Sequence, residues 1–100
     1  MTLLVVGVSH RTAPVTLLDR VALVDGAAER LQVDLLASTH VAESLVLSTC
    51  NRVEIYAEVS KFHGGVLDVT DTLAKATGVD REELTPHLYV RYEDRAVQHM

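Results

Sequence analysis

Cysteine and aromatic residues are scarce in this chain, which has one cysteine, Cys50, three tyrosines, one phenylalanine and no tryptophan. A single cysteine excludes an internal disulfide and a zinc site built from several thiolates. The longest apolar run covers only residues 3–8, whereas a membrane-spanning helix needs roughly twenty residues. We therefore expect a cytoplasmic protein that does not use a membrane.

Positive charge is also in short supply, because nine lysines and arginines face fourteen aspartates and glutamates, for a formal net charge of −5. Affinity for nucleic acids depends mainly on basic side chains that neutralise phosphates, and base stacking needs aromatic rings. The composition excludes a domain dedicated to nucleic-acid binding, so any such contact would be a local property of a few arginines. It is otherwise typical of one globular domain, which we assign to residues 1–100.

Metal and dinucleotide motifs are missing as well. The histidines are His10, His40, His63, His87 and His99. No two of them are spaced like metal ligands on one helix, so we expect no metal site. Gly7 is not followed by the further glycines of a dinucleotide-binding turn, so we expect no cofactor site of that kind in this chain.

The hydrophobic pattern predicts strands and helices in alternation. Strands are expected at residues 3–8, 45–47, 53–59 and 88–92. Apolar residues at helical spacing predict helices over residues 14–35 and 66–76. We expect Asp25 and Gly26 to divide the first helix, with Asp25 capping its second piece, and Gly78 to end the other helix.

The order β-α-β-β-α-β is that of the ferredoxin-like α+β fold, a four-stranded antiparallel sheet in the order 4-1-3-2 with helices on one face. Asp94 is expected to start a further helix at the C-terminal end. In this arrangement Glu54, Tyr56 and Glu58 lie on the open, polar face of the sheet. The first and second strands run in the same direction, so segments 10–12 and 49–52 meet at one end of the sheet, about 10 Å apart.

Two interpretations are open for Cys50. A lone cysteine is often inert packing, but this one stands among polar residues in the turn 48–52. A nearby guanidinium favours the thiolate, which attacks acyl carbons readily. Arg52 either pairs with an acid such as Glu54 or clamps a substrate carboxylate. His99 is either a partly buried structural residue or a general acid or base.

Two segments resemble a known family. Residues 7–15 (GVSHRTAPV) and 47–56 (LSTCNRVEIY) are similar to the N-terminal catalytic domain of glutamyl-tRNA reductase, and residues 96–100 resemble the start of the next family block. The similarity extends over essentially the whole chain, and the family is ferredoxin-like in this region. Ser9 stands where many members have asparagine, and Leu18 where many have arginine.

The resemblance implies NADPH-dependent reduction of glutamyl-tRNA to glutamate-1-semialdehyde, the first committed step of tetrapyrrole biosynthesis, which leads to haem and other porphyrins. It implies that Cys50 is the nucleophile that takes the glutamyl group as a thioester, and that a hydride from NADPH then releases the aldehyde. Thr49, Asn51 and Arg52 would bind the glutamyl group, Arg52 through a carboxylate. His99 would protonate the leaving group or orient the substrate.

Family members are far longer, so the resemblance implies that this chain is a fragment and that the NADPH-binding and dimerisation domains lie outside it. The fragment alone is not expected to complete the reduction. The expected partners are glutamyl-tRNA, the glutamate-1-semialdehyde aminomutase that takes the product, and a second copy of the full-length protein. Without the resemblance, the alternative is a ferredoxin-like regulatory or binding module in which Cys50 is structural or senses redox state.

Overall fold

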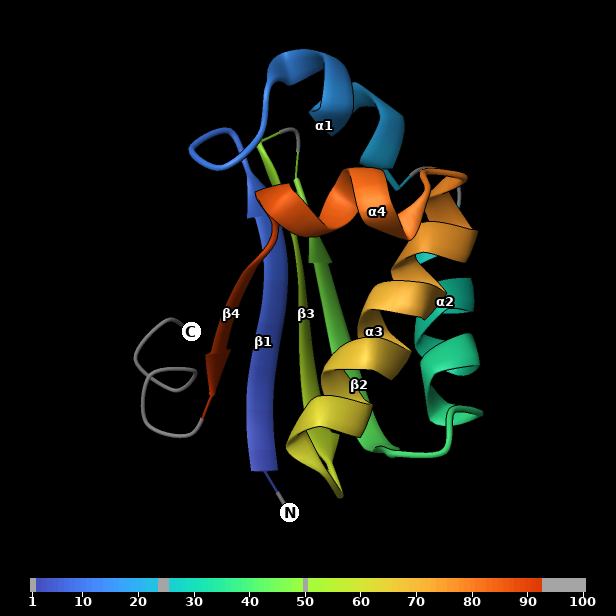
Figure 1. Cartoon of the computed structure of the whole chain (residues 1–100). Helices are drawn as coiled ribbons and strands as arrows, with labels where there is room; N and C mark the ends of the chain where they lie inside the picture. The colour runs from blue at the N-terminus through green and yellow to red at the C-terminus, as the bar shows by residue number, and fades with distance from the viewer. Residues whose placement is uncertain (1, 24–25, 50, 93–100) are drawn as a thin grey trace.

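A computed structural model describes residues 2–23, 26–49 and 51–92 of the chain (Figure 1). The elements are β1 (Thr2–Ser9), α1 (Val15–Val21), α2 (Ala27–Leu36), β2 (Val41–Ser48), β3 (Arg52–Val59), α3 (Phe62–Thr77), α4 (Arg81–Leu84), a 3-10 turn (Thr85–His87) and β4 (Tyr89–Tyr92). The predicted helix after Asp94 lies outside the described residues. No helix in the described part of the chain is both long and apolar enough to cross a membrane.

The strands form one antiparallel sheet in the order β2-β3-β1-β4. This confirms the predicted α+β fold and its strand order. β1 is the central strand, because it pairs along its whole length with β3 and, over residues 4–7, with β4 on its other side. β1 and β2 both end at the upper end of the sheet in Figure 1, and β4 begins there.

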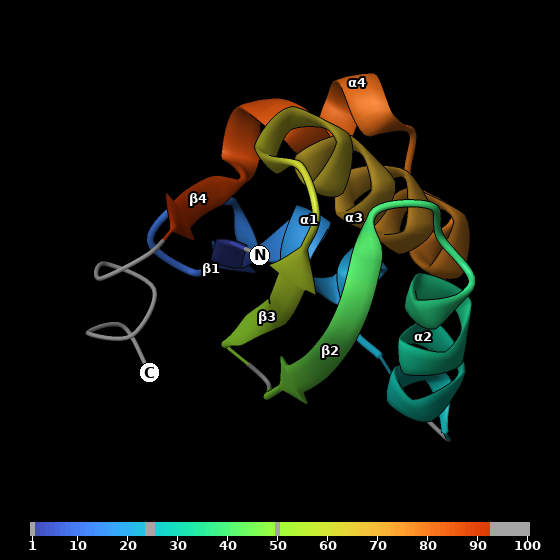
Figure 2. The ribbon, with the colours of Figure 1, turned by 90° about the horizontal axis from the view of Figure 1, so that it is seen from below.

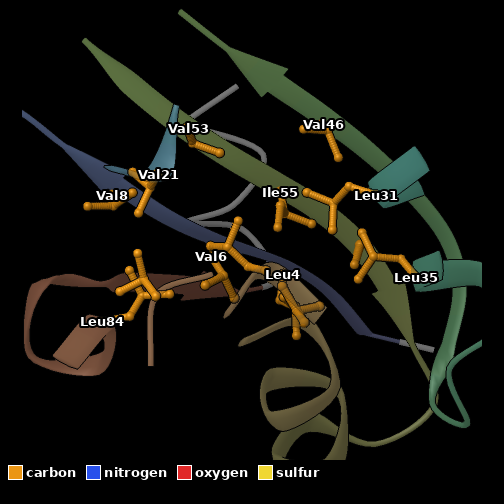
Figure 3. Close-up of a cluster of buried hydrophobic side chains, with 14 of the residues drawn as sticks. Leu4, Val6, Val8, Val21, Leu31, Leu35, Val46, Val53, Ile55 and Leu84 are labelled. Carbon is orange, nitrogen blue, oxygen red and sulfur yellow. The ribbon is translucent and has the colours of Figure 1, made fainter. Parts of the chain in front are cut away.

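The helices cover one face of the sheet, as Figures 1 and 2 show. Alternate residues of each strand point to this face, while apolar side chains three or four positions apart point inward from the helices. Figure 3 labels the side chains that meet there: Leu4, Val6, Val8, Val21, Leu31, Leu35, Val46, Val53, Ile55 and Leu84. All of them are buried, so the core lies between the sheet and the helices.

Two glycines mark helix ends. Gly78, with φ of +73°, is the C-cap of α3, as predicted. The prediction that Asp25 caps the second helical piece is wrong, because the N-cap of α2 is Gly26. Gly26 has φ of +82°, in the left-handed region that glycine adopts without strain. Asp25 itself lies outside the described residues.

The open face of the sheet differs from the prediction at β3. Glu54 and Tyr56 are only 1% and 4% exposed, whereas Glu58 is partly exposed. Tyr56 packs with Val5 of β1, and Glu54 lies opposite Gly7. The prediction of a polar, solvated face at Glu54 and Tyr56 is therefore wrong, because side chains of the neighbouring strands cover both residues.

Replacing Leu31 with alanine should lower the free energy of unfolding by about 2–5 kcal/mol, because this fully buried side chain would leave a cavity. Leu36 on the same helix is 54% exposed, so Leu36→Ala should change it by less than about 0.5 kcal/mol. Urea unfolding followed by circular dichroism measures both variants. Equal losses would contradict the burial of Leu31 in the core.

Candidate functional site

Two loops that are far apart in sequence meet at the end of the sheet where β1 and β2 finish (Figure 1). The backbone N–H of His10 in the β1–α1 loop donates a hydrogen bond of 2.9 Å to the carbonyl of Asn51 in the β2–β3 connection. Ser9 also pairs directly with Arg52 in the sheet. These contacts confirm that the two segments meet at one end of the sheet, but the predicted separation of about 10 Å is wrong. The segments touch because the turn leads directly into β3, the strand that pairs with β1.

The β1–α1 loop is held by its own polar groups. The Thr12 hydroxyl donates to the Ser9 carbonyl at 3.2 Å and accepts from the Ser9 N–H at 3.0 Å. The Arg11 N–H donates to the Ser9 hydroxyl at 3.2 Å. His87 Nδ1 lies 3.0 Å from the Thr12 carbonyl, which can only accept, so this nitrogen carries the proton. The loop is therefore held by hydrogen bonds among its own residues and by His87 from the segment that precedes β4.

The β2–β3 connection is a tight turn whose described residues are exposed. The Thr49 N–H donates to the Arg52 carbonyl at 2.8 Å, and the Asn51 N–H donates to the Thr49 hydroxyl at 3.2 Å. The turn thus places Thr49, Asn51 and Arg52 close together, and their role in substrate binding stays a prediction. Cys50 and His99 lie outside the described residues.

A pocket of about 700 Å³ opens between the two loops and β4. It is lined by Ser9, His10, Arg11, Thr12, Thr49, Asn51, Arg52, Tyr89 and Arg91. Among these lining residues three are arginines and none is a carboxylate, although the chain as a whole carries a net charge of −5. The pocket is suited to a ligand with negative charge.

A buried carboxylate links the two walls of the pocket. Glu54 accepts a hydrogen bond of 2.5 Å from the Tyr89 hydroxyl and one of 3.2 Å from the Tyr56 hydroxyl. Arg52 Nε lies 3.8 Å from Oε1 of Glu54, the oxygen that also accepts the hydrogen bond from Tyr56. Glu54 therefore connects Arg52 on β3 with Tyr89 on β4, across β1.

Gly7 makes this connection possible. It pairs with Glu54 on one side and with Tyr89 on the other, so it lies directly beneath their contact. A Cβ atom at Gly7 would lie only 2.5 Å from Cζ of the Tyr89 ring. Any side chain at position 7 would push the Tyr89 ring away from Glu54.

The pKa values of Tyr89 and Tyr56 are both raised by their surroundings. Burial raises the pKa of the Tyr89 hydroxyl well above its ordinary value, and the hydrogen bond and charge of Glu54 raise it further. The pKa of Tyr56 is raised in the same way, first by burial and then by the charge of Glu54. Both hydroxyls are consequently proton donors to Glu54 at neutral pH.

The sequence did not predict that Tyr89 and Arg91 line this pocket, nor that Glu54 is buried beneath it. Tyr89 and Arg91 line the pocket from β4, although they stand about forty positions after the turn that forms its other wall. Glu54 was considered as a possible partner of Arg52, and the ion pair is present, but its burial was not expected. The placement of β4 beside β1 was the available signal for Tyr89 and Arg91.

The histidines form no metal centre in the described part of the chain. His40 Nδ1 lies 3.1 Å from Asp68 Oδ2, away from the pocket, whereas His10 lines it. Within residues 2–23, 26–49 and 51–92 no three side chains of histidine, cysteine, aspartate or glutamate are arranged to hold a metal ion.

Known proteins resemble this chain in sequence and in fold. The family model for the N-terminal domain of glutamyl-tRNAGlu reductase matches residues 6–100. Glutamyl-tRNA reductases of Streptomyces coelicolor and Thermobifida fusca are 55% and 51% identical over the whole chain, which covers 17% and 21% of their lengths. The solved structure of glutamyl-tRNA reductase from Methanopyrus kandleri has a TM-score of 0.60 at 26% identity, over 97% of this chain and 20% of that chain. The chain thus spans about a fifth of the length of these relatives.

Replacing Glu54 with glutamine should lower the pKa of the Tyr89 hydroxyl, because the negative charge that opposes the phenolate is removed. Tyr89 holds its proton more tightly in the folded state, so its contribution to stability is present below pH 10 and is lost as the pH rises above the ordinary tyrosine value of 10.0. The loss of stability at alkaline pH should therefore be smaller in Glu54→Gln than in the wild type.

Ultraviolet titration of the phenolate, with Tyr89→Phe to assign the signal, measures the pKa, and urea unfolding at a series of alkaline pH values measures the stability. Glu58→Gln is the matched control, because Glu58 lies on the same face of β3 but is partly exposed. An unchanged Tyr89 titration in Glu54→Gln would contradict the contact between the two side chains.

Proposed function

This chain belongs to the glutamyl-tRNA reductase N-terminal domain family, and we propose that it is the part of an NADPH-dependent glutamyl-tRNA reductase that accepts the glutamyl group from glutamyl-tRNA. The observation that carries this proposal is the pocket in which Thr49, Asn51 and Arg52 meet the loop of His10 and Arg11. The pocket is open, basic and formed by the two segments that carry the family resemblance.

We assign the chemical step to Cys50, which stands in sequence between two residues that line the pocket, Thr49 and Asn51. Its thiolate attacks the carbonyl carbon of the aminoacyl ester. A carbon–sulfur bond forms, the carbon–oxygen bond to the ribose breaks, and the ribose oxygen leaves with the tRNA and takes up a proton. The product is a glutamyl thioester on Cys50, and no electrons are transferred in this step.

Arg52 is assigned to the free carboxylate of the substrate. A glutamyl group esterified through its α-carboxyl has one carboxylate left, on its side chain. The side chain of Arg52 is 52% exposed and lines the pocket, and its Nε lies 3.8 Å from Oε1 of buried Glu54. A guanidinium held in this way presents a planar pair of N–H donors that match a carboxylate. Thr49 and Asn51 supply further polar groups on the same wall.

His99 is proposed to give the proton to the departing ribose oxygen. The family resemblance supports this role, and His99 lies outside the described residues. The step needs a group that is protonated before the bond breaks, which an imidazole provides near neutral pH.

The hydride donor is proposed to bind outside the described residues. Gly7 supports this, because it lies inside β1 beneath the Tyr89 ring rather than in the strand-to-helix turn that binds a dinucleotide. We assign the binding of NADPH and the release of glutamate-1-semialdehyde to the rest of a longer protein. The cytoplasmic location, the full-length homodimer and product transfer to the aminomutase rest on the resemblance and stay predictions.

In the full-length protein, replacing Arg52 with glutamine should slow formation of the thioester by about 10- to 100-fold, the size of a lost hydrogen bond to a charged group. The protein is mixed with glutamyl-tRNA in the absence of NADPH, and the glutamyl mass increment is followed by intact-mass spectrometry of quenched samples. Peptide mapping assigns the increment to a residue.

Arg81→Gln is the matched control, because Arg81 is exposed and binds Asp71 at 2.9 Å, outside the pocket. It should acylate at the wild-type rate, and Cys50→Ser should carry no increment. A wild-type protein that acylates elsewhere than Cys50, or not at all, would show that the proposed function is wrong.

A further inference from the structure

The pocket holds more positive charge than a glutamyl group can use. Arg11, Arg52 and Arg91 all line it, but a glutamyl ester offers a single free carboxylate and also carries a positive ammonium group. If Arg52 binds the carboxylate, two guanidinium groups remain for another anion. This argument rests on the function proposed above.

Arg11 lies in the β1–α1 loop and Arg91 on β4, and both line the pocket. Arg52 belongs to β3 and Arg91 to β4, and β1 runs between them, so their strands are about 10 Å apart. The Arg91 guanidinium lies over the Tyr89 ring, with Cζ 5.7 Å from the ring centre, and its Nη1 donates to the Val90 carbonyl at 3.0 Å. The contact with Tyr89 holds this charge beside the pocket.

The charges of Arg11 and Arg91 have no acidic counterpart among the residues that the structure describes. In the described parts of the chain, neither Arg11 nor Arg91 forms an ion pair with a carboxylate, whereas Arg20 is paired with Glu83 and Arg81 with Asp71. Both pocket arginines are exposed. Two exposed guanidinium groups without a carboxylate partner among the described residues therefore line the same pocket.

We propose that Arg11 and Arg91 form a second anion site, which binds the phosphate on the 5′ side of the nucleoside that carries the glutamyl ester. About ten covalent bonds of roughly 1.5 Å join the free carboxylate of the glutamyl group to this phosphate, and they reach about 12 Å when extended. A group of this length can extend along the pocket from Arg52, which pairs with Ser9 of β1, towards Arg91, which pairs with Val5 of the same strand. The pocket then binds the 3′ end of the charged tRNA at two points, with the ester between them.

The test compares two glutamyl donors on the full-length protein, again without NADPH so that the cofactor's phosphates play no part. One donor is glutamyl-tRNA, and the other is 2′(3′)-O-glutamyl adenosine, which has the same ester but no phosphate. The second-order rate of acylation of Cys50 is measured by intact mass. Arg11→Gln and Arg91→Gln should each slow the reaction with glutamyl-tRNA by roughly tenfold, the size of one charge-assisted contact. With glutamyl adenosine both variants should react at the wild-type rate.

Three further variants and a salt series make the outcome specific. Arg52→Gln should slow both donors, because it acts on the glutamyl group itself. Arg91→Lys keeps the charge and should retain most of the rate with glutamyl-tRNA. Each glutamine variant should also flatten the salt dependence of the tRNA reaction by about one unit of slope, as expected for one lost phosphate contact. Arg81→Gln should match the wild type with both donors.

The possible failures are distinct. Equal slowing of both donors in Arg11→Gln and Arg91→Gln would show that these residues act on the glutamyl group or on the fold, and would overturn the second anion site. Unchanged rates with glutamyl-tRNA would overturn it as well, while thioester formation on Cys50 in the wild type would leave the proposed function standing. If the wild-type protein forms no thioester on Cys50 with glutamyl-tRNA and none with glutamyl adenosine, the proposed function and the second site are both overturned.

Discussion

The carboxylate of Glu54 is the group on which the geometry of the pocket depends. A buried charge is costly unless polar partners surround it, so Glu54 requires the partners that the structure gives it. Among the described residues they include two phenolic hydroxyls and one guanidinium, which come from β3 and β4. Because β3 and β4 lie on the two sides of β1, this one carboxylate brings Arg52 and Tyr89 together across the strand. The absence of a side chain at Gly7 leaves the space for the contact to cross the central strand.

The distribution of charge follows from the same contact. Glu54 offsets part of the charge of Arg52 from below, at a site closed to solvent, whereas Arg11 and Arg91 face the cavity without such an acid in the described residues. Arg20 and Arg81, by contrast, are paired with Glu83 and Asp71 outside the pocket. A lining with three arginines and no carboxylate on a net-negative chain favours a negatively charged ligand at this opening.

Short-range patterns in the sequence predicted much of the fold. The structure contains strands at the apolar run 3–8 and at the alternating segment 53–59, and α3 ends at the predicted Gly78. The order of the predicted elements along the chain gave the sheet topology. The topology in turn predicted that the two loops meet, because the ends of two parallel-running strands must share one end of the sheet. The burial of Glu54 was missed, since alternation separates two faces but does not say what covers the second. That cover comes from Tyr89, a residue 35 positions away whose register against Gly7 no local pattern specifies. Assignments at Cys50 and His99 stay predictions from the family resemblance.

The frame of the site is built from backbone groups. The hydrogen bonds from His10 to Asn51 and from Thr49 to Arg52 join main-chain atoms, so the two loops keep their positions whichever side chains they carry. Thr12 and Ser9 add side-chain contacts that brace the β1–α1 loop, but the link between the loops does not use them. The link between the loops therefore does not use the side chains at 49, 51 and 52, although the Thr49 hydroxyl accepts from the Asn51 N–H within the turn and Arg52 contacts Glu54. Glu54 differs from them because its side chain is buried and lies between Arg52 and Tyr89. Both the arrangement of the pocket and the packing of the sheet therefore depend on this residue.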